Sequence, residues 1–104
     1  MNRVIKPGDL QVDEAALTEL CQRYSVRELA VFGSAARDRM HAASDVDLLV
    51  EFEPGPKVDL VDHAGLMLDL SQLMGRNVDV VSKRALKPLI REAILRQARP
   101  IYAA

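Results

Sequence analysis

Cysteine and aromatic residues are scarce in this sequence of 104 residues, which has one Cys, no Trp, two Phe and two Tyr. A single cysteine, Cys21, excludes an intrachain disulfide framework. With only His41 and His63 beside it, no structural zinc site can be built at the usual ligand spacings. We therefore expect a protein of the reducing cytoplasm.

Long hydrophobic runs are also missing. No stretch approaches the length of about 18 uncharged apolar residues that a membrane-spanning helix requires. Residues 1–10 lack the apolar segment of a secretory signal peptide. We therefore expect neither export nor association with a membrane.

The composition that remains is that of a small globular protein, with 49% hydrophobic and 28% charged residues. A chain of this size buries about 60 to 68% of the surface that its unfolded form exposes, enough for one core. We expect a single domain over residues 1–104, with no room for a separate substrate-binding domain. A substrate would then lie in an open cleft or be brought by a partner.

The net charge of −1 hides an asymmetry along the chain. Residues 45–62 hold six acidic side chains and only one base, Lys57, whereas residues 83–99 carry six basic side chains and only one acid, Glu92. An acidic concentration can mark a divalent-cation site, and a basic one a surface for phosphate or for an acidic partner. Ordinary solvated faces are the competing explanation for most of these charges.

Hydrophobic spacing predicts alternating helices and strands in the order αβαβαβα. Asp13 can cap the first helix, Gly75 can end the third in a left-handed turn, and Pro88 suits the first turn of the last. Ser82 can cap the turn before that last helix, and a short extended segment is expected at 101–102. The predicted helices are 13–24, 35–40, 59–74 and 88–97, and the predicted strands are 27–32, 45–52 and 77–82.

The same spacing predicts which side chains form the core. Cys21 falls on the apolar stripe of the first helix, and Tyr24 and Tyr102 are interpreted as packing residues. The helix at 59–74 and the last helix are expected to bury apolar residues at helical intervals. These are Leu60, Ala64, Met67, Leu68, Leu70, Leu73 and Met74 in the former, and Leu89 or Ile90, Ala93 and Ile94 in the latter.

Strand 45–52 alternates between two faces, one apolar and one that carries Asp45, Asp47, Leu49 and Glu51. The Cα atoms of Asp45 and Asp47 would be about 6.6 Å apart, which lets both carboxylates reach a pair of Mg²⁺ ions about 3.5 to 4 Å apart. Asp79 projects from the next strand, on the face opposite its apolar neighbours. We expect the three carboxylates to converge.

A phosphate-binding turn precedes these acids. Gly33 allows close approach of the backbone, Ser34 adds a hydroxyl donor, and the helix expected after them directs unpaired N–H groups at an anion. A solvated strand face is the alternative, because two exposed carboxylates about 5 Å apart repel by only about 0.8 kcal/mol. At an effective dielectric near 20 the repulsion rises to about 3 kcal/mol, and a cation would be needed to offset it.

Three segments together resemble a known family: 33–37 (GSAAR), 44–48 (SDVDL) and 77–81 (NVDVV). The chain is similar to the DNA polymerase β-like nucleotidyltransferase superfamily in its minimal, MNT-type branch. The resemblance runs from Leu29 to about Tyr102. It implies an α+β fold, with a small mixed β-sheet and helices packed on one side. It also implies nucleotidyl transfer from a nucleoside triphosphate, ATP in this branch, with two Mg²⁺ ions.

The resemblance also implies roles for single residues. Gly33 and Ser34 would hold the β and γ phosphates, and Asp45 and Asp47 would ligate both metal ions. Asp79 would ligate one metal ion and help to deprotonate the attacking hydroxyl. These three aspartates are the expected catalytic and metal-ligating residues.

Two further residues complete the expected nucleotide site. Arg37 matches the family's arginine and can contact phosphate, and Ser44 belongs to the matching segment before the aspartates. Asp38 departs from the glycine often found at that position, which bears on the turn and not on the carboxylates.

Proteins of this branch are commonly antitoxins that silence a HEPN-type RNase toxin by transferring AMP to one of its tyrosines. We therefore expect a HEPN-type partner. A non-catalytic module that neutralises its partner by binding alone is the alternative. A third possibility is the catalytic subunit of a transferase for small molecules or nucleic acid ends, which would need an added substrate-binding chain.

Other sites fail on spacing. The sequence contains neither a P-loop nor a dinucleotide fingerprint, and a calcium loop beginning at Asp45 would need Gly and Glu where Val50 and Pro56 stand. Ser34 lacks the surroundings of a hydrolase nucleophile. The basic run 83–99 has no interleaved aromatic residues for stacking on bases, so docking of a partner is favoured over direct binding of nucleic acid.

Overall fold

The computed structural model describes residues 4–5, 12–32, 46–55 and 58–104. The predicted strands and the helices at 13–24, 59–74 and 88–97 are confirmed to within a few residues, whereas the predicted helix 35–40 lies outside the described residues. The strands are β1 (Val4–Ile5), β2 (Val12–Asp13), β3 (Val26–Phe32), β4 (Val46–Phe52), β5 (Val78–Ser82) and β6 (Arg99–Ala103). The helices are α1 (Glu14–Arg23), α2 (Leu60–Met74), the 3₁₀ turn η1 (Lys83–Ala85) and α3 (Pro88–Gln97).

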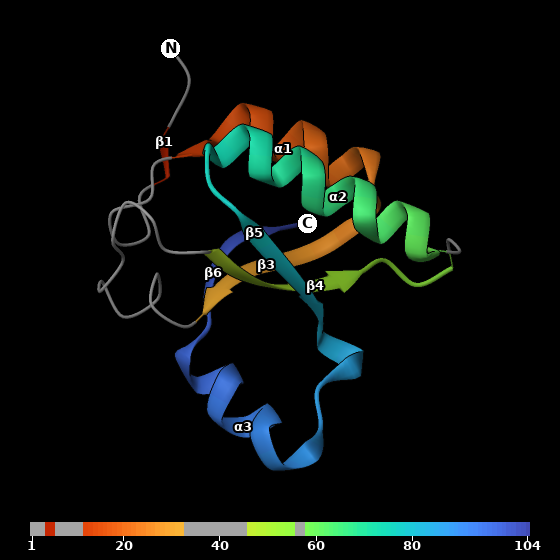
Figure 1. The fold of residues 1–104 in the computed structure, drawn as a ribbon, viewed down its shortest axis with the longest axis vertical. Coiled ribbons are helices and arrows are strands. Elements are labelled where there is room, and N and C mark those ends of the chain that lie inside the picture. Colours follow the sequence, from red (N-terminus) through yellow and green to blue (C-terminus); the bar gives the residue numbers. More distant parts are fainter. Residues whose placement is uncertain (1–3, 6–11, 33–45, 56–57) are drawn as a thin grey trace.

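A four-stranded sheet in the order β5-β4-β3-β6 organises the molecule (Figure 1). β4 runs parallel to β5, whereas β3 runs antiparallel to both β4 and β6. The sheet is therefore mixed, which confirms the prediction. β1 and β2 form a separate antiparallel pair of two-residue strands, which the sequence pattern did not predict.

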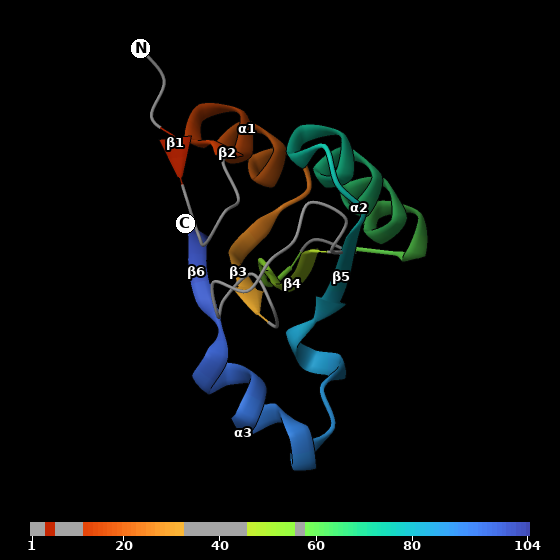
Figure 2. The ribbon, with the colours of Figure 1, turned by 60° about the vertical axis from the view of Figure 1, so that its left-hand side comes forward.

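Helices α1 and α2 lie side by side over one face of the sheet (Figures 1 and 2). The main core lies beneath them, and it includes the fully buried Cys21, as predicted. Tyr24 and Tyr102 pack against this core, also as predicted. The two helices approach closely at Gly65, where an added Cβ would lie 3.0 Å from the Tyr24 hydroxyl oxygen.

The helix ends follow the local sequence signals. Asp13 caps α1 by accepting a hydrogen bond from the Ala15 amide at 3.0 Å. Asp59 and Asp62 form a reciprocal capping box at the start of α2. Gly75 ends α2 with φ at 65°, in the left-handed region that glycine adopts without strain.

The opposite face of the sheet carries a smaller cluster of apolar residues. Ala30, Leu49 and Leu86 are buried there, and Ile94 of α3 packs against them. Leu49 therefore lies on the predicted carboxylate face but is covered, because Leu86 and Ile94 pack in the same cluster. α3 itself lies at the end of the molecule away from α1 and α2 (Figures 1 and 2).

The burial predicted for two helices is partly wrong. No residue of α3 is buried: Leu89 is 96% exposed, Ile90 and Ala93 are exposed, and Ile94 is only partly covered. In α2 the buried residues are Leu66, Leu70 and Met74, whereas the predicted core positions Leu60, Ala64 and Leu68 face outward. Helical spacing identifies a stripe but not what covers it, and these stripes are left uncovered by the described part of the chain.

The chain end departs from the prediction in two details. Residues 99–103 form the edge strand β6 against β3, a longer element than the short extended segment expected at 101–102. Ser82 precedes η1 but makes no side-chain capping hydrogen bond. Among the described residues, no helix combines the length and the apolar character needed to span a membrane.

Candidate active site

Two of the three predicted catalytic aspartates lie directly opposite each other on neighbouring strands. Asp47 of β4 pairs with Asp79 of β5 in the parallel register. Paired residues of parallel strands point to the same face, and adjacent strands are about 4.8 Å apart. Their neighbours Val46, Val78 and Val80 are buried in the main core, so the two aspartates face the side away from α1 and α2. The predicted convergence of Asp47 and Asp79 is therefore supported by the register.

Hydrogen bonds set the register of β4 against β5 and tie β5 to α2. The Val46 amide donates to the Asn77 carbonyl at 2.8 Å, immediately before the two aspartates. The Val78 amide donates to the Ser71 hydroxyl of α2 at 3.1 Å. His63 Nε2 donates to the Val80 carbonyl at 2.8 Å, since that oxygen can only accept. Helix α2 thus holds β5 on both sides of Asp79.

The structure adds one neighbour that the sequence pattern did not single out. Phe32, the last residue of β3, is the antiparallel partner of Asp47, so Phe32, Asp47 and Asp79 form one row across three strands. Phe32 is half-buried against the smaller cluster. Its place directly before the predicted Gly33-Ser34 turn is the signal by which the sequence could have indicated it.

Most other acids of the central run have structural roles. Glu51, on the same face as Asp47, pairs with Lys83 at 3.2 Å and with Arg27 at 3.6 Å. Asp59 and Asp62 are used in the capping box of α2. Asp79 is exposed and Asp47 is half-buried. These acids therefore stabilise the fold, whereas Asp47 and Asp79, which we call the aspartate pair, are the candidate site residues.

The remaining predicted site residues lie outside the described residues. The part of the chain that the structure describes holds no group of three or more side chains able to ligate a metal ion together. The aspartate pair supplies two of the three carboxylates that the prediction calls for, and Asp45 is the third. The predicted residues not described are Gly33, Ser34, Arg37, Ser44 and Asp45.

The chemistry of the aspartate pair suits Mg²⁺. This ion prefers hard oxygen ligands and is usually bound by one or two carboxylates together with waters and substrate phosphates. Two carboxylates from adjacent rigid strands provide such ligands without rearrangement of the backbone. The pair therefore fits a magnesium–triphosphate better than it fits a structural metal site closed by protein ligands alone.

Burial and hydrogen bonding raise the pKa values of three residues in and beside the main core. Burial raises the pKa of the Cys21 thiol to about 12, which makes this thiol a poor nucleophile. The hydrogen bond to Asp69, followed by burial, raises the pKa of Tyr24. Burial likewise raises the pKa of Tyr102. All three residues belong to or border the main core, on the opposite side of the sheet from Asp47 and Asp79.

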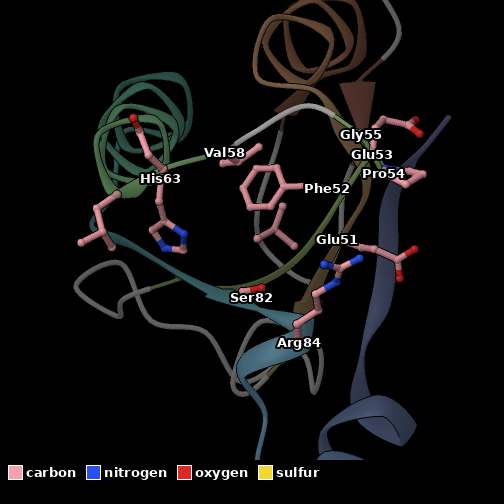
Figure 3. A pocket seen from close by; sticks show the side chains of 12 residues that line it. Glu51, Phe52, Glu53, Pro54, Gly55, Val58, His63, Ser82 and Arg84 are labelled. Atoms are coloured by element: carbon pink, nitrogen blue, oxygen red, sulfur yellow. The ribbon is translucent and has the colours of Figure 1, made fainter.

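A cavity of about 650 Å³ lies at the other end of the β4–β5 pair. Figure 3 shows His63 and Arg84 on opposite sides of Phe52, with Ser82 below it. The rings of Phe52 and His63 are 6.5 Å apart between centroids. Neither Asp47 nor Asp79 lines this cavity, so it is separate from the predicted site.

Most of the chain matches a known protein family. A family model described as nucleotidyltransferase domain matches residues 14–101. The protein adenylyltransferase MntA of Thermococcus cleftensis is 43% identical over 79 residues, which cover 76% of this chain and 78% of that protein.

Solved structures agree in fold. A structure assigned as a minimal nucleotidyltransferase superposes with a TM-score of 0.73 and 46% identity, covering 85% of this chain and 88% of that one. One chain from the structure of a tri-AMPylated Shewanella oneidensis HEPN toxin in complex with an MNT antitoxin superposes on this chain with a TM-score of 0.62 and 17% identity. That match covers 88% of this chain and 70% of the other, and at this identity it supports the fold alone.

Proposed function

The chain belongs to the nucleotidyltransferase domain family, in its minimal, MNT-type branch, and on this basis we propose that it is an antitoxin that transfers AMP from ATP to a tyrosine of a HEPN-type toxin. Mg²⁺ is the proposed cofactor, as two ions, and the nucleoside triphosphate is the co-substrate. One observation carries the proposal: Asp47 and Asp79 lie in register on the sheet face that α1 and α2 leave open.

The aspartate pair is proposed to hold the metal. Asp45 and Asp47 would ligate both ions, and Asp79 would ligate one of them. Bound Mg²⁺ supplies charge neutralisation for the triphosphate and for the leaving pyrophosphate. Asp79, exposed at the start of β5, can also accept the proton of the attacking hydroxyl. Gly33, Ser34, Arg37 and Ser44 are proposed to bind the triphosphate.

In-line attack on the α phosphorus needs alignment and electrostatic stabilisation more than a covalent protein intermediate. This requirement suits a chain of 104 residues with one main core, because the acceptor can arrive as a residue of another folded protein. The similarity to MntA favours a protein acceptor, because that relative is called a protein adenylyltransferase.

The non-catalytic alternative keeps the fold and neutralises its partner by binding alone. Such a module has no need for two carboxylates in register on adjacent strands. The aspartate pair therefore favours the enzyme.

The test is incubation of the chain with α-labelled ATP, Mg²⁺ and the protein encoded by the neighbouring gene, which the proposal expects to be of the HEPN type. We expect label on a tyrosine of the partner, and a loss of about 100-fold or more in the rate with Asp47→Asn. Glu51→Gln is the matched control, since it removes a carboxylate from the same face of the same strand, and it should leave transfer within about twofold of wild type.

The outcomes separate the two functions. Label that disappears with Asp47→Asn and persists with Glu51→Gln supports transfer. Tight binding of the partner with no label from any nucleoside triphosphate would refute transfer and establish the binding module. Label on a non-tyrosine residue would correct the acceptor while retaining the enzyme.

A further inference from the structure

Helix α3 exposes an apolar and basic face that its place in the fold does not explain. No residue of α3 is buried, and Leu89 is 96% exposed. Pro88, Leu95 and the guanidinium-bearing residues Arg91 and Arg96 line an open groove of about 500 Å³ along this helix. Helical spacing puts these residues on one arc, which we call the α3 face: Pro88, Leu89, Arg91, Glu92, Leu95 and Arg96.

Helix α3 packs on the same face of the sheet that carries the aspartate pair. The inner side of α3 is anchored through Ile94 to the small cluster that contains Leu49 and Val81. Leu49 is two residues beyond Asp47 on β4, and Val81 is two residues beyond Asp79 on β5, so both lie on the same sheet face as the aspartates. A protein bound to α3 would therefore stand beside the face that carries Asp47 and Asp79.

The charge of this region indicates the chemistry of the partner. Residues 83–99 hold six basic side chains against Glu92, and Glu92 is already paired with Arg96. Arg91 is exposed and donates from one guanidinium nitrogen to the Lys83 carbonyl at 3.3 Å, and a guanidinium has further N–H donors that can bind a carboxylate. An apolar centre with basic neighbours is typical of a protein-docking surface. Nucleic acid would be expected to meet stacking aromatics, and the α3 face has none.

We infer that the α3 face docks an acidic, partly apolar patch of the acceptor protein and thereby presents the acceptor hydroxyl to Asp47 and Asp79. This inference rests on the proposed function, because it names the surface through which the acceptor of that reaction is held. Leu89 and Leu95 supply apolar contact, and Arg91 supplies the charged contact. These residues are docking residues and touch no reacting atom.

The test compares Leu89→Glu with Leu60→Glu in the full chain. Both leucines lie in the first turn of a helix and are exposed, Leu89 at 96% and Leu60 at 86%, so neither substitution disturbs a core. Calorimetry measures binding, without nucleotide, of the protein encoded by the neighbouring gene, and labelled transfer measures KM for that protein and kcat. Arg91→Glu is the second variant, and circular dichroism verifies folding.

We expect Leu89→Glu and Arg91→Glu to weaken partner binding and raise KM for the acceptor by about tenfold or more. kcat at saturating acceptor should stay within about twofold, since docking residues do not act on the transition state. Leu60→Glu should behave as wild type. Added salt should raise the wild-type KM more than that of Arg91→Glu, because a charged contact is screened.

Other results would overturn the docking surface. One such result is that Leu89→Glu binds the partner as tightly as wild type, and another is that Leu60→Glu loses as much affinity for the partner as Leu89→Glu. A third is that the wild-type chain self-associates and that Leu89→Glu dissociates it while the affinity for the partner is unchanged. Binding of single-stranded RNA that Leu89→Glu and Arg91→Glu abolish, with partner affinity unchanged, would assign the α3 face to RNA instead. If wild type binds the partner but transfers no label, while Leu89→Glu still weakens binding, the docking surface stands and the proposed transfer fails.

Discussion

Asp47 and Asp79 are a candidate metal site because they lie next to each other. One exposed aspartate on a strand is an ordinary solvated side chain. Asp47 and Asp79 stand in register on adjacent strands, whose backbones are about 4.8 Å apart, so their carboxylates can bind the same ligand. A divalent cation such as Mg²⁺ needs hard oxygen ligands of this kind. Glu51, on the same face of β4, has a structural role, because it pairs with Lys83 and Arg27.

Asp79→Asn is expected to abolish transfer while leaving the fold intact. Asparagine keeps the size of the side chain but removes the charge that ligates the metal and accepts the proton, so the rate should fall by about 100-fold or more. Asp79 is exposed, so the free energy of unfolding should change by about 0.5 kcal/mol at most. Labelled transfer and urea unfolding measure the two quantities, and unchanged turnover would remove Asp79 from the site.

Tyr24 is expected to make stability depend on pH in the alkaline range. Its hydroxyl donates to Asp69 at 2.5 Å, and this hydrogen bond is the main cause that raises its pKa. A raised pKa means that the folded state favours the protonated phenol. The stabilisation is therefore present below the unfolded pKa of about 10 and is lost as the pH rises through the folded pKa.

Urea unfolding of wild type and Tyr24→Phe at pH about 8 and about 11 tests this dependence. Between these values wild type should lose more stability than Tyr24→Phe, because only wild type has this phenol to ionise. Lysines and Tyr102 titrate in both proteins and cancel in the comparison. An equal loss in the two proteins would show that the Tyr24–Asp69 hydrogen bond is not formed in solution.

At the scale of elements, the turn after α2 determines where β5 begins. Gly75 adopts φ of 65° as the helix cap, and β5 starts three residues later, just before Asp79. Ser71 then ties the first residue of β5 back to the helix through the Val78 amide. The position of Asp79 thus depends on a glycine that lies outside the strand.

Gly75→Ala should destabilise the protein by about 1 kcal/mol, because an L-residue with a side chain is strained in the left-handed region. Nothing lies within 4 Å of the added Cβ, so the loss comes from the backbone and not from a clash. Gln72→Ala, at an exposed position of the same helix, is the control and should change stability by about 0.5 kcal/mol at most. Equal effects of the two substitutions in urea unfolding would contradict the left-handed cap.

Local signals and burial differ in how far the sequence predicts them. Asp13 and Gly75 act on backbone groups within a few residues, so their sequence positions were enough to predict the start of α1 and the end of α2. The exposure of Leu68 and Leu89 could not be predicted in this way. Helical spacing reports a stripe, whereas burial depends on which element covers it, and that is decided by contacts far apart in the sequence.

At the scale of the whole molecule, the last strand completes the sheet. β6 pairs with β3, and Ile101 is buried in the main core together with residues of α1 and β3. Alternation in strands 45–52 and 77–82 correctly predicted the faces of Asp47 and Asp79, but their exact register became visible only in the assembled sheet. Strand pairing is non-local, so the sequence could predict convergence but not the row Phe32–Asp47–Asp79.

Ile101→Ala should destabilise the molecule by about 2 to 5 kcal/mol, because it removes buried methyl groups and leaves a cavity under the edge strand. Leu89→Ala removes a similar volume from a side chain that is 96% exposed, and it should change stability by about 0.5 kcal/mol at most. Thermal unfolding followed by circular dichroism measures both. A small effect of Ile101→Ala would mean that β6 is not part of the cooperative unit.

The most direct measurement is paramagnetic broadening of backbone amide signals by Mn²⁺ with a non-hydrolysable ATP analogue, followed by NMR. The account predicts that the amides of residues 46–48 and 78–80 broaden together at low Mn²⁺ and that Asp79→Asn weakens both effects. The amides around Phe52 and His63, which line the cavity at the other end of β4, should stay sharp. Broadening confined to that cavity, or to only one of the two strands, would contradict a shared metal site at Asp47 and Asp79.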